Sequence, residues 1–121
     1  MEEPPSSPIP LALPVDWPSL VVLVGDEDFA REMAAQFIVS GRHVLEYIDE
    51  ALAQGNIGAL GKKAHEIRGA SASMYARGTT SASAHLEAAA NAGHSDRLPD
   101  LAQQLREEFS CAEKFLQSKV A

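Results

Sequence analysis

A histidine near the middle of the chain stands among residues that suit the transfer of a charged group. His65 has Lys62 three residues before it and Arg68 three residues after it, so a helix places both cations one turn from the imidazole. Gly61 and Gly69 flank it at four residues on either side. Glycine inside a helix costs about 1 kcal/mol relative to alanine, and the advantage expected here is room for another protein to approach the ring. An accessible imidazole with clearance and positive charge around it suits a nucleophile that carries a phosphoryl group.

The residues around His65 predict a helix that leaves the imidazole near the surface. Apolar and small residues recur at spacings of 4, 3, 4 and 3 and fall on one stripe of a helix: Leu60, Ala64, Ile67, Ser71 and Met74. His65 lies about 100° from Ala64 around the helix axis, on the flank of this stripe or on the open face. The alternative interpretation is an ordinary solvated histidine with no chemical role.

The segment that begins at His65, His-Glu-Ile-Arg-Gly-Ala-Ser-Ala-Ser-Met-Tyr-Ala, resembles the signature of histidine-containing phosphotransfer (HPt) domains. In that family the histidine precedes a hydrophobic residue, a lysine, a glycine and several small residues, and a Leu-Glu pair follows farther along the chain. Leu86 and Glu87 supply this pair. The Val-Gly-Asp sequence at residues 24–26 also resembles the segment that often precedes the first bundle helix. The resemblance covers roughly residues 15–118.

The resemblance implies a phosphocarrier of a two-component phosphorelay. His65 would accept a phosphoryl group from the aspartate of a response-regulator receiver domain and pass it to the aspartate of another receiver. Arg68 and Lys62 would then stabilise the phosphoryl oxygens, and Gly61 and Gly69 would let the receiver dock. Such a chain is a transfer intermediate without kinase activity of its own. It needs no cofactor, because the receiver would bring the Mg²⁺ ion.

Several positions depart from the family pattern. Arg68 replaces the usual lysine, which keeps the charge but puts it on a planar fork. Tyr75 stands where the family has glycine, Ser73 where it often has asparagine, and Thr79 where leucine is usual. We expect these differences to affect the choice of partner more than the phosphoryl chemistry. Ser71 and Ser73 are candidates for hydrogen bonds that orient the helix or the ring, with Ser71 facing the core.

The composition sets the class of protein independently. The chain has 121 residues, of which 45% are hydrophobic and only 6% aromatic, so one domain of closely packed helices is expected. A net charge of −7 argues against nucleic acid or an anionic membrane as the main partner. The lone Cys111 excludes an intrachain disulfide and indicates a reducing compartment. No metal site is expected, because the histidines lack acidic or cysteine partners at ligand spacing: His43, His65, His85 and His94.

The chain is expected to divide at residue 14. Five prolines in residues 1–14 indicate a disordered or extended linker. Residues 15–121 are predicted to form an all-α domain, an antiparallel four-helix bundle with a short N-terminal capping helix. Gly41 and Gly55 are expected to stop helices. The predicted helical segments are 16–25, 26–41, 44–55, 56–76, 80–92 and 98–116.

The sequence leaves a second function open, in a different class. A helical protein-interaction module, never phosphorylated, could use the same face to dock a receiver or a kinase. The chain is expected in the cytoplasm without direct membrane contact, either as a freestanding shuttle or as the C-terminal module of a membrane-bound hybrid sensor kinase. In the second case the receiver of the same kinase is a candidate partner.

Overall fold

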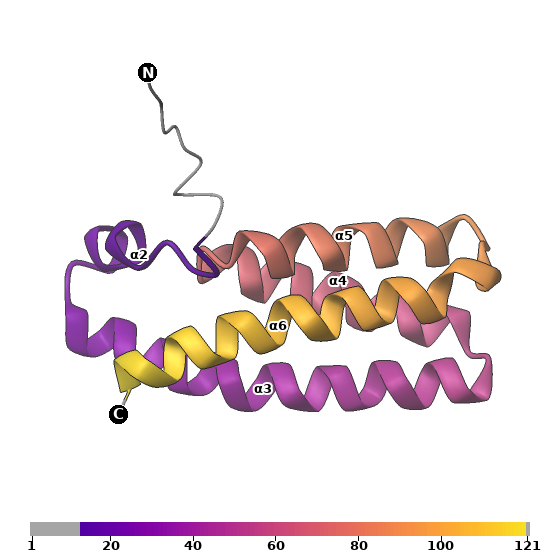
Figure 1. Cartoon of the computed structure of the whole chain (residues 1–121), viewed down its shortest axis with the longest axis horizontal. Coiled ribbons are helices and arrows are strands. Elements are labelled where there is room, and N and C mark those ends of the chain that lie inside the picture. The colour runs from indigo at the N-terminus through magenta and orange to yellow at the C-terminus, as the bar shows by residue number, and fades with distance from the viewer. Residues whose placement is uncertain (1–12, 121) are drawn as a thin grey trace, which may run out of the picture.

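The computed structural model describes residues 13–120, and helices account for almost all of this part of the chain. Four long helices lie side by side as an antiparallel bundle, and a short helix, α2, covers one end of it (Figure 1). This arrangement confirms the predicted all-α four-helix bundle with a short N-terminal capping helix. The predicted linker lies almost wholly outside the described residues. The elements are α2 (Trp17–Val24), α3 (Glu27–Gln54), α4 (Ile57–Ser73), α5 (Arg77–Asn91), the 3-10 turn η1 (Ser95–Arg97) and α6 (Leu98–Val120).

The helices follow one another around the bundle in chain order. The closest neighbours are α4 and α5, and α6 returns to pack against α3, so α6 lies diagonally across from α4. The core between them contains large aliphatic residues that are almost fully buried: Ile48, Leu60, Ile67, Leu86, Leu98, Leu105 and Leu116. The whole predicted stripe of α4 is buried, from Leu60 to Met74. None of the described helices is both long and apolar enough to cross a membrane.

The start of α4 is fixed by local hydrogen bonds. The side chain of Asn56 accepts a hydrogen bond of 3.1 Å from the backbone amide of Ala59, which caps the first turn. Gly55, immediately before it, ends α3 in the left-handed conformation with φ of 69°. These two residues therefore turn the chain from α3 into α4, as their types predict.

Gly41 does not stop a helix, and this prediction was wrong. α3 continues through it as one helix of 28 residues, where we expected two. Gly41 is buried, and a Cβ atom on it would lie 2.6 Å from Cζ of Phe109 and closer still to Cε1. The glycine thus makes room for the Phe109 ring, which packs against Phe37 with ring centroids 5.5 Å apart. The residue that requires a glycine at this position, Phe109, lies on α6, so the sequence around Gly41 could not reveal the reason.

The turn between α4 and α5 has an unusual residue in a standard geometry. The amide of Ala76 donates to the carbonyl of Ser71, and the amide of Tyr75 donates to that of Ala72, the two hydrogen bonds of a Schellman motif. Tyr75 has φ of 58°, the left-handed conformation that this motif requires. A residue with a Cβ atom pays roughly 1–2 kcal/mol there. This cost explains why the family has glycine at the position that Tyr75 occupies in this chain.

Candidate functional site

His65 lies in the middle of α4, with its side chain 65% exposed, and its imidazole contacts two charged side chains. Its Nδ1 atom is 2.8 Å from Oε2 of Glu87, which comes from α5. The other carboxylate oxygen of Glu87 accepts a hydrogen bond of 2.7 Å from Nε of Arg68. Nη2 of Arg68 lies 3.0 Å from the same Nδ1 atom. The three side chains therefore close a ring of polar contacts on the α4–α5 surface.

The contact with Glu87 assigns the tautomer of the imidazole. An ionised carboxylate only accepts hydrogen bonds, so the contact at 2.8 Å requires a proton on Nδ1 of His65. With that proton in place, Nδ1 has no lone pair for Arg68, and the lone pair of the neutral ring lies on Nε2. Nε2 is then the ring nitrogen with a free lone pair, the one chemically able to act as a nucleophile.

The electrostatics keep Glu87 in the form that this geometry needs. Burial by itself raises the pKa of the Glu87 carboxyl, whose side chain is only 18% exposed. The hydrogen bond with His65 and the positive charge of Arg68 act in the opposite direction and prevail, so the pKa is lower than usual. Glu87 is therefore a carboxylate at neutral pH, able to hold the imidazole and the guanidinium together.

The two predicted cations differ in their surroundings. Arg68 is held against Glu87 beside the imidazole, with a side chain that remains 40% exposed. Lys62 lies exposed on α4, and its role stays a prediction. The adjacent Lys63 belongs to another neighbourhood, because its ammonium group pairs with Glu66 at 3.2 Å and lies over the ring of Tyr47.

The two predicted clearance glycines also differ. Gly69 is exposed, and a Cβ atom on it would meet nothing within 4 Å. Gly61 is buried, and its Cβ would lie 3.3 Å from Oδ1 of Asn91 and 3.4 Å from Cβ of Ala90. Gly61 therefore serves the close packing of α4 on α5, and our expectation that it gives a partner room is wrong. The clearance at Gly69 stays a prediction.

The two serines proposed to orient the site form hydrogen bonds with backbone carbonyls, and Ser71 also with Thr80. The imidazole of His65 is contacted by Glu87 instead. The buried hydroxyl of Ser71 contacts the Arg68 carbonyl at 3.1 Å and the Thr80 hydroxyl at 2.9 Å, which ties α4 to α5. The hydroxyl of Ser73 donates to the carbonyl of Gly69 at 3.2 Å, within α4. In the sequence, Glu87 stands out only as part of the Leu-Glu pair, and this pair is the signal that pointed to its role.

A family model for the Hpt domain matches residues 32–114, more than half of the chain. The chain belongs to the Hpt family. Its structure is also similar to that of histidine-containing phosphotransfer protein B (HptB) from Pseudomonas aeruginosa PAO1, with a TM-score of 0.83 and 26% sequence identity. The match covers 90% of this chain and 96% of that one. No curated protein matches this chain.

Family membership gives this Hpt domain its general role. It is a phosphocarrier of a phosphorelay, and receiver domains of two-component systems are its class of partner. Hpt domains are transfer intermediates rather than kinases. Among the described residues, no three histidine, cysteine, aspartate or glutamate side chains gather as they would around a metal ion.

Proposed function

We propose that His65 is the phosphoacceptor, taking the group from the aspartyl phosphate of one receiver and giving it to the aspartate of another. The observation that carries the proposal is the contact of its Nδ1 atom with Glu87 at 2.8 Å on an exposed imidazole. This contact leaves the lone pair on Nε2. A phosphoryl donor can then approach from solvent, on the side of the ring away from Glu87.

The transfer step conserves the proton on Nδ1. The lone pair of Nε2 of His65 attacks the phosphorus atom, the N–P bond forms, and the P–O bond to the receiver breaks. The electron pair of the broken bond returns to the aspartate as a carboxylate. The ring becomes a cation, and the carboxylate of Glu87, held on Nδ1, stabilises it. The reverse sequence delivers the phosphoryl group to the second receiver.

Arg68 and Lys62 have the charge to stabilise the phosphoryl oxygens. Arg68 binds Glu87 through Nε at 2.7 Å, so part of its planar fork stays available for a second anion. Lys62, exposed one turn before His65, would supply a more flexible charge. Mg²⁺ is expected on the receiver, beside its own aspartates, and we propose no cofactor and no kinase activity for this chain.

The charge distribution supports docking of an acidic partner over α4 and α5. α3 has six carboxylates and only two cations, in keeping with the net charge of −7. α4 and α5 have the opposite balance, with two carboxylates, Glu66 and Glu87, and four cations: Lys62, Lys63, Arg68 and Arg77. Receivers present aspartates at their phosphorylation site, so complementary charge favours this face. We place the exchange in the cytoplasm, and a receiver within the same polypeptide remains a candidate partner.

The proposal is tested by replacing the acceptor. His65→Gln removes the nucleophile from an exposed position, so the domain is expected to fold while losing all phosphoryl acceptance. The assay incubates each protein with a phosphorylated receiver and Mg²⁺ and measures base-stable, acid-labile phosphate. His85→Gln, an exposed histidine on α5, is the matched control and is expected to accept phosphate normally. A His65→Gln protein that is still phosphorylated overturns the proposal.

A further inference from the structure

Two hollows in the surface meet at Tyr75. One lies between α2 and the α4–α5 turn and is lined by Pro18, Ser19, Val22, Leu23 and Tyr75. The other lies between α4 and α5, and its lining includes Arg68, Ala72, Tyr75, Arg77, Thr80 and Ala84. Tyr75 is the residue that the two linings share, so it stands at the boundary between them.

The backbone explains why a large ring stands at this place. The Schellman motif puts Tyr75 in the left-handed conformation, at a position where a glycine would leave the surface without a side chain. The backbone amide of Asp16 donates a hydrogen bond of 3.0 Å to the Tyr75 carbonyl, which holds the turn against the start of α2. The ring is half-buried against the core and therefore has a fixed place.

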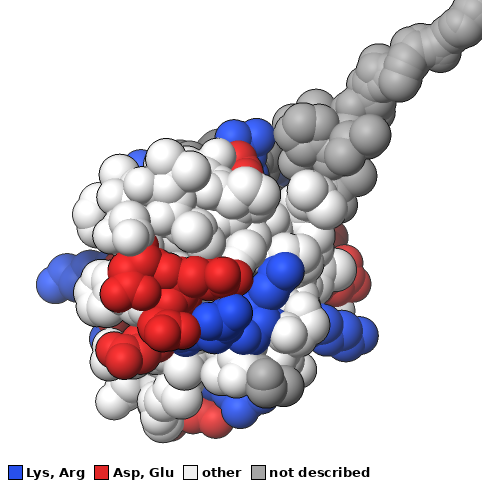
Figure 2. All heavy atoms as spheres, turned by 90° about the vertical axis from the view of Figure 1, so that its left-hand side faces the viewer, with Lys and Arg blue, Asp and Glu red and all other residues white. Residues whose placement is uncertain are grey.

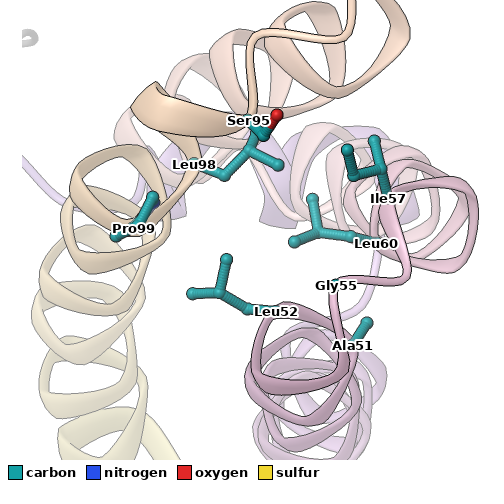
Figure 3. A pocket seen from close by; sticks show the side chains of 8 residues that line it. All are labelled: Ala51, Leu52, Gly55, Ile57, Leu60, Ser95, Leu98 and Pro99. Atoms are coloured by element: carbon teal, nitrogen blue, oxygen red, sulfur yellow. The ribbon is translucent and has the colours of Figure 1, made fainter.

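A third hollow of similar size lies at the other end of the bundle, lined by residues such as Leu52, Ile57 and Leu98 (Figure 3). Its volume is about 410 Å³, against about 400 Å³ for the α4–α5 hollow, so size does not distinguish the two. Its lining has no charged side chain. The α4–α5 hollow instead includes Arg68, which binds Glu87 and lies 3.0 Å from Nδ1 of His65. It is therefore continuous with the phosphotransfer site.

The surface on the far side of Tyr75 is apolar and exposed. Val22 is 81% exposed and Leu23 is 65% exposed, and α2 contains no charged residue. Figure 2, which views the end of the bundle that carries α2, shows an uncharged area above a belt of acidic and basic side chains. An exposed apolar area next to a charged one is typical of a surface that contacts another protein. A path across the surface from His65 therefore meets the cation Arg68 first, then the ring of Tyr75, and then the aliphatic side chains of α2.

We propose that Tyr75 selects the receiver partner, through apolar side chains that the receiver places on its ring while the aspartyl phosphate faces His65. The inference rests on the phosphotransfer role of His65 proposed above. The occupant is the receiver because the hollow continues into the His65 site and is bordered by the cations Arg68 and Arg77, which match acidic residues around the receiver aspartate. Buried tyrosines contribute strongly to protein interfaces.

The test compares a large donor with a small one. The receiver in its phosphorylated form needs the docking surface, whereas phosphoramidate can reach the imidazole without it. Tyr75→Gly removes the ring and suits the left-handed backbone, so the fold is kept. We expect the receiver concentration for half-maximal transfer to rise about tenfold, a loss that only the minority of energetically important interface residues show on truncation. The maximal rate of transfer from the receiver and the rate of labelling by phosphoramidate are each expected to change by less than about twofold.

Two further variants separate docking from structure. Tyr75→Phe keeps the ring and is expected to transfer like the wild type. Val22→Ser, at an exposed position on α2, is expected to weaken transfer in the same direction as Tyr75→Gly but by less. Val39→Ser makes the same change at an exposed valine of α3, diagonally across from α5, and is expected to have no effect.

The outcomes also separate this inference from the one on which it rests. Transfer from the receiver that is indifferent to Tyr75→Gly overturns the selection role, while labelling of His65 by phosphoramidate leaves the phosphoacceptor in place. A wild-type protein that neither donor phosphorylates on His65 overturns the proposed function itself. A Tyr75→Gly protein that loses both activities and melts early assigns the ring to folding, which also overturns its role in selection.

Discussion

Two of the glycines inside the long helices of this Hpt domain have opposite neighbourhoods. Gly41 in α3 is buried under the ring of Phe109, whereas Gly69 in α4 is exposed one turn after His65. At Gly41 the missing side chain is replaced by a ring from another helix. At Gly69 the space stays open to solvent. The comparison teaches that a glycine inside a helix indicates close approach, but not whether the approaching group belongs to the same molecule.

The two halves of the bundle around these glycines differ in the side chains that pack between their helices. The seam of α3 and α6 contains the rings of Phe37 and Phe109, which pack against each other at a tilt of 53°. The seam of α4 and α5 contains small side chains, with hydroxyls that bond across it or back to the backbone: Ser71, Thr80 and Ser83. Small residues let two helix backbones approach closely. As a result, Glu87 on α5 comes within hydrogen-bonding distance of His65 on α4.

The largest expected effect on stability is at Gly41. Gly41→Ala puts a methyl group against the buried Phe109 ring, and overpacking of this kind costs about 1–3 kcal/mol. Gly69→Ala is the matched variant and is expected to stabilise the domain by up to about 1 kcal/mol, because the helix gains a better former and the methyl meets open space. Urea unfolding of both proteins measures the difference. Equal stabilities would mean that Phe109 moves aside at no cost and that the contrast between the two glycines is not energetic.

The next effect is on transfer rather than on folding. Gly69→Leu places a large side chain one turn after His65 on the same face, so the receiver can no longer approach closely. We expect the transfer rate to fall at least about tenfold, which corresponds to 1.4 kcal/mol in the barrier, with a melting temperature close to that of Gly69→Ala. The measurement is the rate of phosphoryl transfer from a phosphorylated receiver. If Gly69→Leu unfolds, or if it transfers normally, the open space at Gly69 has no role in docking.

The smallest expected effect is the pH dependence that Glu87 adds to stability. Its pKa is lower in the folded protein than in the unfolded chain, so its stabilising contribution is present above the ordinary glutamate pKa of about 4.3 and is lost as the pH falls below it. Glu87→Gln lacks this titration. The partners of Glu87 are partly exposed, so the difference between the two proteins is expected to be about 0.2–1 kcal/mol at pH 7.

This pH prediction is checked by thermal unfolding of both proteins between pH 3 and pH 7. The gap in melting temperature should narrow toward the acidic end. A gap that stays constant over this range would mean that the carboxylate of Glu87 is not preferentially stabilised in the folded state. The tautomer assignment of His65 would then lose its support, because it depends on that carboxylate.

The sequence predicted well what depends on neighbouring residues in the chain. The buried stripe of α4, its cap at Asn56 and the end of α3 at Gly55 all follow from local patterns, and the structure has them. Gly41 and Gly61 were misinterpreted for a common reason. The groups that explain them, Phe109 on α6 and Ala90 on α5, are distant in sequence and become neighbours only in the folded bundle.

In the candidate site, too, the contacts between residues distant in sequence could not be predicted. The position and exposure of His65 follow from the period of one helix, so they could be predicted. Its contact with Glu87 depends on the register of α5 against α4, which small residues such as Ser71 and Thr80 determine. The sequence marks Tyr75 as a departure from the family pattern, but only the structure shows its left-handed backbone and its place between two hollows.

The tie between Asp16 and Tyr75 has a mechanical consequence. Val15 is fully buried, the Asp16 amide bonds the Tyr75 carbonyl, and the Asp16 carboxylate reaches Arg77 at 3.4 Å. The chain therefore enters the domain at a fixed pivot, directly beside the end of the helix that bears His65. The start of α2 and the end of the helix that bears His65 are therefore held together as one unit.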